Sequence, residues 1–536
     1  NRMKRGSRRF GATVAALGLF AAQTASATQA APAADPTEKQ GSLYLQCDGQ
    51  PNNMSGGERA ARVLGAIALV GLLAPQPESP DASKRKFGAE GVAACTSLID
   101  GDKKETNAKR RAHLILARAL HRIEAKDYDA ALADAALARR EMTESGLSSD
   151  PYYARSQGRA PDLIEAAALY RMGKPAQAEE AALRGMENVR HNLFGLVMVP
   201  GYMLATRTGS EAELRYLGWR SRASAPTLRF EAARLEEFGR FADAARAYDG
   251  LIDYNRVNTP KNILSIRLAE AAVAHALAGH ADVAAERARD AQANFDQRKA
   301  DGKPEGEDAA FVEVMDLYGI VHLADSGDVK GARRLFAARS QWVAASFGAV
   351  TEVTRRLRTG AAADELIGGL GKDVDQLWAD RDAKLRAATL AKDSDNKTLF
   401  GLIPAADQAG EYEALSKTIW RADKSKLLIV PKKPPENGSK FEVLIGYAPL
   451  MPSIDGYALH AALLAKARGK QGFIITPIVQ NGLIAALFIT GDRGAPGLPE
   501  GMFNDAETVI ADLSPVIPAP ETLEARRKAA TASGSK

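Results

Sequence analysis

One ten-residue pattern recurs five times between residues 126 and 336, and it limits the possible folds more than any other feature of the sequence. Its clearest copy is "GRFADAARAY" at 239–248. In and around this copy, an apolar stripe stops at a glycine and a second stripe follows. Apolar stripes at helical spacing on either side of a break predict helix, turn, helix. The more degenerate copies are "KDYDAALADA", "GKPAQAEEAA", "GHADVAAERA" and "GDVKGARRLF".

Each residue type in the pattern has a physical role. Gly239 supplies the left-handed conformation that ends a helix without a steric penalty. Ala244 is small, which lets two helices approach closely, and the bulky Tyr248 fills the space beside it. The positions that we expect to pack between helices are Ala131, Ala178, Gly239, Phe241, Ala244, Tyr248, Ala284 and Ala332.

In these positions the chain resembles the tetratricopeptide-repeat (TPR) family, in its exported bacterial form. The resemblance implies a mainly α fold, an α-solenoid of stacked helical hairpins, over roughly residues 92–345. The intervals between the aligned alanines are 47, 66, 40 and 48 residues, and they depart from the family repeat of about 34. We expect a further degenerate hairpin in the longest interval, at Tyr202–Trp219.

The resemblance also implies a partner groove lined by the first helix of each hairpin. Carried over to this sequence, the inward positions are Leu163, Tyr170, Arg229, Glu236 and Val273, together with the alanines Ala167, Ala233, Ala269 and Ala276. This lining is mostly apolar, which argues against the recognition of an acidic peptide terminus. It favours an apolar segment, supplied either by a partner or by the chain itself.

The first residues predict export. Lys4, Arg5, Arg8 and Arg9 precede the apolar run 10–22 and the small-residue stretch 25–27, the arrangement of a cleavable signal peptide. We therefore expect a signal peptide at 1–27, a flexible leader at 28–42 and a periplasmic or secreted protein. An uncleaved membrane anchor is the rival interpretation, although the run is shorter than the ~20 residues of a membrane span.

Removal of residues 1–27 would take away five basic residues and no acidic ones, so the formal charge of +5 belongs to that segment. A neutral body argues against a nucleic-acid partner. Cys47 and Cys95 are the only cysteines, and an even pair in an exported chain predicts a disulfide. We expect it in an N-terminal helical cap, 43–110, together with a buried core helix at 62–74. That apolar run is too short to span a membrane.

The remaining chain divides at changes in periodicity. We expect the degenerate repeat array at 111–345, further helices at 346–428, a Pro- and Lys-rich linker at 429–440, a small α+β module at 441–518 and a tail at 519–536. The module should have the order strand, helix, strand, strand, helix. Its second and third strands should form a hairpin at Asn481-Gly482, a strong turn signal.

No catalytic or metal-binding motif is found in the sequence. The sequence lacks HExxH, GxSxG and CxxC, and we expect no cofactor and no metal. Apart from Asp455, five residues back, no carboxylate or nucleophile is spaced to share a helical face with His460, so a buried or surface structural histidine is the simpler interpretation. The Gly-rich "TGDRGAPGLPEG" at 490–501 lacks the features of a phosphate-binding loop.

These features favour a non-enzymatic scaffold that binds an envelope protein or peptide of unknown identity. Self-association remains open. The alternative is an envelope hydrolase or small-ligand-binding protein whose site lies in the C-terminal module around His460, Arg493 and the Gly-rich loop.

Overall fold

The structure is a computed structural model in which residues 40–536 form one compact unit. The expected signal peptide, most of the leader, the apolar run 62–74 and most of the linker lie outside the described residues. The structure describes residues 41–51, 79–102, 104–199, 201–204, 206–207, 209–303, 306–394, 396–405, 409–421, 428–429, 440–446, 450–480 and 483–533.

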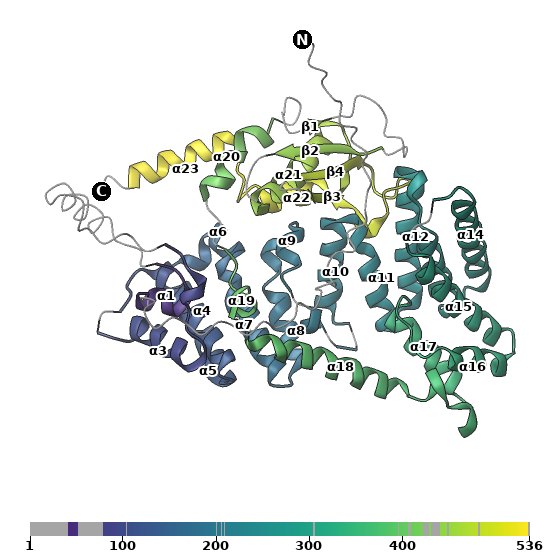
Figure 1. The fold of residues 1–536 in the computed structure, drawn as a ribbon. Helices are drawn as coiled ribbons and strands as arrows, with labels where there is room; N and C mark the ends of the chain where they lie inside the picture. Colours follow the sequence, from purple (N-terminus) through teal and green to yellow (C-terminus); the bar gives the residue numbers. More distant parts are fainter. Residues whose placement is uncertain are drawn as a thin grey trace, which may run out of the picture. The chain divides into compact units, whose positions relative to one another are not determined.

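The described residues are mainly helical, with a small antiparallel sheet near the C-terminus (Figure 1). Each of the five sequence patterns forms a helical hairpin. The hairpins are α4 (Ala108–Glu124) with α5 (Tyr128–Glu144), α7 (Ala160–Arg171) with α8 (Pro175–Arg184), α11 (Leu228–Glu237) with α12 (Phe241–Asn258), α13 (Ser265–Leu277) with α14 (Ala281–Ala300), and α15 (Asp308–Asp325) with α16 (Val329–Ala338).

All five hairpins reverse through the same turn. In each turn, a residue that follows the first helix has a positive φ, between 61° and 100°. The next residue donates its N–H to the carbonyl oxygen five residues earlier, at N···O distances of 2.8–3.1 Å. This is the Schellman arrangement, which satisfies carbonyls at the end of a helix. The left-handed residues are Lys126, Gly173, Gly239, Gly279 and Gly327; Lys126 is the only non-glycine with positive φ among the described residues.

The turn places one alanine at the fourth residue of each second helix. Ala131, Ala178, Ala244, Ala284 and Ala332 are at most 1% exposed. Phe241 and Tyr248 are also buried, at the start and in the middle of α12. The small residues therefore lie inside the helix packing, where the sequence pattern predicts them.

The prediction of a hairpin at Tyr202–Trp219 is wrong. The described residues of this stretch form one α-helix, α10 (Glu211–Ala223), which is preceded by a 3₁₀ turn at Gly201–Leu204 and by the short α9 (Leu193–Leu196). Gly195, Pro200 and Gly201 follow one another too closely for a long first helix. The longest interval between hairpins is therefore filled by short turns and a single helix.

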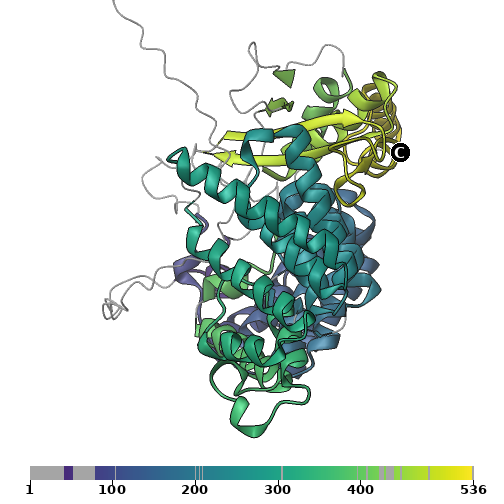
Figure 2. The same ribbon diagram turned by 90° about the vertical axis from the view of Figure 1, so that its right-hand side faces the viewer.

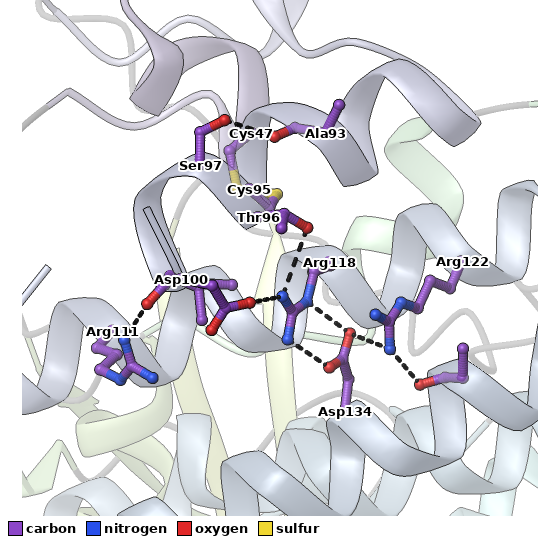
Figure 3. Close-up of polar contacts among 12 residues, drawn as sticks. Cys47, Ala93, Cys95, Thr96, Ser97, Asp100, Arg111, Arg118, Arg122 and Asp134 are labelled. Atoms are coloured by element: carbon purple, nitrogen blue, oxygen red, sulfur yellow. Dashed lines mark hydrogen bonds and ion pairs between the residues drawn. A yellow bond between two sulfur atoms is a disulfide. The ribbon is translucent and has the colours of Figure 1, made fainter. Parts of the chain in front are cut away.

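A disulfide joins two helices of the N-terminal cap, and charged side chains join the cap to the first hairpin. Cys47 lies in α1 (Leu43–Asp48) and is bonded to Cys95 of α3 (Gly88–Ile99), as the sequence predicts. Beside the disulfide, the Arg118 guanidinium bonds both oxygens of Asp134, at 3.0 and 2.8 Å, and one oxygen of Asp100 at 2.7 Å (Figure 3). These contacts connect α3, α4 and α5.

After the last hairpin the chain returns along the first helices of the array. We call residues 347–402 the return segment; it contains α17 (Phe347–Arg358), α18 (Val374–Ala391) and α19 (Asn396–Phe400). Helix α17 packs on α11, α13 and α15, whereas α19 packs on α4. Leu399, Phe400 and Leu402 complete the apolar core of the first two hairpins. The return segment thus contacts both ends of the array.

The C-terminal module is larger than the sequence predicts. Its sheet has the order β1-β2-β4-β3-β5 and its neighbouring strands are antiparallel. The strands are β1 (Leu428–Ile429), β2 (Glu442–Gly446), β3 (Gly472–Gln480), β4 (Leu483–Gly491) and β5 (Asn504–Asp505); the helices are α20 (Ala409–Ile419), α21 (Leu450–Ala467), α22 (Ala506–Leu513) and α23 (Pro520–Ser533).

Two boundaries of the module differ from expectation. Tyr412 and Ile419 of α20 are buried in the module's core, so this core begins before the expected linker. The expected tail is also wrong, because α23 occupies most of 519–536. Pro520 begins this helix, and Leu523 is buried beside α20.

The sheet is covered on both faces (Figure 2). On one face Phe473, Ile475 and Phe488 pack against α21 and α22. On the other, Ile474 packs with Leu228 and Tyr254 of the array. The module is therefore fixed to the helices rather than tethered by its linker alone.

Replacing Ala244 with leucine should destabilise the array. Inserting three extra carbon atoms at a position of 0% exposure forces the helices apart and costs about 1–3 kcal/mol. Denaturant unfolding should show this loss. The matched control is Ala293→Leu on the exposed side of α14, which should change the free energy of unfolding by less than about 0.5 kcal/mol; equal effects would contradict the packing described.

Removing the disulfide should weaken the cap. The bond joins residues with a sequence separation of 48. Closing a loop of this length should raise the free energy of unfolding by about 4 kcal/mol in the chain-entropy description. The double variant Cys47→Ala and Cys95→Ala should lose stability and hydrogen-exchange protection in α1 and α3. Reduction of the unaltered chain should give the same loss, and full protection after reduction would contradict this assignment.

Candidate functional site

The inward positions expected from the sequence do not line an open groove in the described structure. Leu163, Tyr170, Glu236 and Val273 are 0–6% exposed, whereas Arg229 keeps about a third of its side chain exposed. They lie on the first helices α7, α11 and α13, as expected. The chain itself covers these positions. It is one of the two occupants expected from the sequence, the other being a partner.

One part of this cover is held mainly by polar contacts. Arg386 of α18 donates to the carbonyl oxygens of Tyr170 and Arg171 at the end of α7, at 3.0 and 2.6 Å. Asp393, just after α18, accepts from the Arg171 guanidinium at 2.9 and 3.0 Å. Within α18, Trp378 and Thr389 are the buried residues. Helix α18 is thus attached at its ends and exposes most of its length.

An aromatic and arginine cluster joins α18 to the start of α17. The Trp378 ring lies edge-on to Phe347, with ring centroids 4.9 Å apart. The guanidinium groups of Arg207 and Arg381 lie 5.2 and 5.1 Å from the Trp378 centroid, within the range of cation–π attraction. Arg381 also pairs with Glu237 of α11 at 2.9 Å.

A small cavity lies beneath α17, and three of the sequence-derived positions lie at or beside it. Its volume of about 10 Å³ is about enough for one water molecule. Its polar lining consists of Glu236, Tyr248, Glu270 and Ser346, and its apolar lining of Val273, Val314, Leu317, Ala345 and Ala349. A site of this size has no room for an organic substrate.

The two carboxyl groups of the cavity differ in their partners. Glu270 pairs with Arg229 and Arg267, each at 2.8 Å, so it has two cationic partners. Glu236 is only 3% exposed, and burial raises its pKa to about 8. The Tyr248 hydroxyl lies 3.5 Å from its Oε2. Because a buried carboxyl without a cationic partner resists ionisation, Glu236 holds a proton at neutral pH.

The alternative site in the C-terminal module does not assemble around His460. The His460 ring is fully buried on α21, and its Nδ1 lies 2.9 Å from the carbonyl oxygen of Ile419, to which it donates. Burial lowers the pKa of His460, which favours the neutral ring. The histidine therefore has the structural role that the sequence favours.

The Gly-rich loop is engaged by the array. The Gly497 N–H donates to Asp253 of α12 at 2.7 Å, and its carbonyl accepts from Asn258 at 2.7 Å. Arg493 pairs with Glu500 and lies over the Phe503 ring. No described contact joins this loop or Arg493 to His460, so the expected alternative site is not brought together.

Sequence reasoning missed a buried polar contact between the array and the module. Arg155, in α6 (Pro151–Arg155), pairs with Asp455 of α21, and the Tyr412 hydroxyl donates to Asp455 at 3.1 Å. The Asp455 and Arg155 side chains are 0% and 9% exposed. The two residues are 300 positions apart, so no local pattern could have revealed the pair.

No group of three or more His, Cys, Asp or Glu side chains within the described ranges could hold a metal ion. In the same part of the chain, no helix has both the length and the apolar content needed to cross a bilayer.

Comparison with known proteins finds no relative. No protein-family model, no curated protein and no solved structure matches the chain. The proposals below therefore depend on the chain's own residues.

Replacing Arg155 with leucine should destabilise the docked module. The change leaves the Asp455 carboxylate buried without its cation, which costs about 3–5 kcal/mol. Denaturant unfolding and hydrogen exchange in α21 should report the loss. Arg355→Leu is the control, since Arg355 is 61% exposed and its pair with Glu352 should be worth less than about 1 kcal/mol. Equal losses in the two variants would contradict the coupling.

Proposed function

We propose that this chain is an exported, non-enzymatic scaffold built on TPR-like repeats. In this proposal the hairpins form an α-solenoid that presents helix surfaces to a protein or peptide of the cell envelope. The partner is a polypeptide rather than a nucleic acid, because the chain without residues 1–27 is formally neutral.

The observation that carries the proposal is the use of one turn and one buried alanine in five hairpins. Repeated hairpins that pack on their neighbours are the usual basis of extended binding surfaces. The Cys47–Cys95 disulfide supports an oxidising compartment.

The described sites also support binding over catalysis. The cavity beneath α17 is too small for an organic substrate. His460 is buried, and the Gly497 amide is bound by Asp253. An envelope hydrolase or small-ligand protein remains the alternative, and its proposed residues provide the comparison in the experiment.

Site-specific photo-crosslinking in cells tests the scaffold. Photoreactive residues at Leu335 and Val343, which are 50% and 82% exposed, should capture the same envelope protein, and the purified pair should form a complex of fixed stoichiometry. Cell fractionation should find the chain outside the cytosol, with Cys47 and Cys95 unreactive toward alkylation until they are reduced.

Other outcomes would contradict the proposal. Free thiols in the unreduced, denatured protein would contradict the disulfide and weaken the argument for export. Failure of the captured protein to form a complex with the purified chain would exclude it as the partner. A hydrolytic activity lost in His460→Ala or Arg493→Ala, together with no capture from either position, would favour the enzyme instead.

A further inference from the structure

The start of α17 packs directly on the backbone of α11 at Glu236. A Cβ at Gly348 would collide with the backbone of Glu236 and Glu237, so only glycine permits this approach. Ser346 caps α17 by accepting from the Ala349 N–H at 3.0 Å, and Ser346 and Ala349 line the cavity together with Glu236. The buried carboxyl therefore lies beside the residues that begin the cover.

The charged groups around Glu236 leave it without a cation of its own. On α13, Glu270 engages both Arg229 and Arg267. On α11, Glu237 pairs with Arg234 and, from α18, with Arg381. Glu307, which precedes α15, lies 3.8 Å from Arg267.

The other neighbours of Glu236 are neutral. Helix α12 contributes the Tyr248 hydroxyl, while α15 contributes the apolar Val314 and Leu317. An ionised Glu236 would face the carboxylate of Glu270 across the cavity with no free positive charge.

We propose that α17 is a proton-dependent cover, whose closure over the inner faces of α11, α13 and α15 is stabilised while Glu236 is neutral and weakened when Glu236 is ionised. When α17 opens, Glu236 reaches water and loses its proton. Opening also releases Phe347 from Trp378, and it uncovers Val273, Val314 and Leu317. The inner face thus changes from a covered, mostly buried surface to an accessible apolar surface.

The direction of the pH effect follows from proton binding. The ordinary pKa of the carboxyl is 4.5, and burial raises the pKa of Glu236 to about 8 in the closed form. Between these values the closed form holds one proton that the open form releases. Closure must therefore weaken as pH rises through this window and change little above it.

This cover goes beyond the proposed scaffold function, because opening can be measured without a partner. If the scaffold proposal also holds, the partner gains access to the inner face as pH rises. Failure of capture would remove the scaffold and leave the cover untouched, whereas failure of the opening measured below would remove only the cover.

Hydrogen exchange of the full chain between pH 5.5 and 9 tests the cover. After correction for intrinsic exchange rates, protection of α17 should fall by up to about tenfold per pH unit between pH 6 and 7.5 and level off above pH 8. Helix α7 should keep its protection over the same range. In Glu236→Gln, which keeps the shape and removes the charge, α17 protection should not depend on pH.

A second pair of variants separates opening from misfolding. Gly348→Ala should lower α17 protection at every pH, because the methyl group cannot fit against α11. Gly319→Ala, on an open side of α15, should behave like the unaltered chain. The proposal is overturned if α17 protection is independent of pH in the unaltered chain, or if it falls equally in Glu236→Gln.

Discussion

The array depends on a chain reversal in which one residue adopts a left-handed backbone. At five places this residue ends the first helix, and the following hydrogen bond fixes where the second helix begins. The fourth residue of each second helix is then always the alanine at the helix contact. The geometry within a hairpin is therefore constant, although the intervals between hairpins range from 40 to 66 residues.

Buried ion pairs decide how the later parts of the chain are placed on the array. Arg171 pairs with Asp393, and Arg155 pairs with Asp455, 222 and 300 residues further along. A buried charge is costly without its partner, so an arrangement that separates these groups is penalised. Apolar contacts alone would be compatible with a range of positions of these later segments on the array. Matched buried charges are compatible with few. The pairs thus contribute specificity of docking as much as stability.

The sequence predicts features that depend on residues close together in the chain, and it misses contacts between residues far apart. Glycine and alanine at fixed spacing predict the hairpins, and alternating apolar residues around Asn481-Gly482 predict the pairing of β3 with β4. The turn at Lys126 is recognised from the residues that follow it, since lysine rarely adopts positive φ. The burial of Glu236 and Val273 could not be predicted, because it depends on α17, which is more than 70 residues away. The helical period of α18 likewise gives no indication of what its ends bind.

The return segment has a consequence for how the protein is made. Leu399, Phe400 and Leu402 belong to the same apolar core as Leu114 and Ile115 of α4. A ribosome releases α4 long before it reaches residue 399. Part of the apolar core of the first hairpin therefore stays exposed to water until the return segment has been made. Completion of that core is a late, long-range step, and such steps slow folding. During synthesis the earliest helices are the ones most in need of a chaperone.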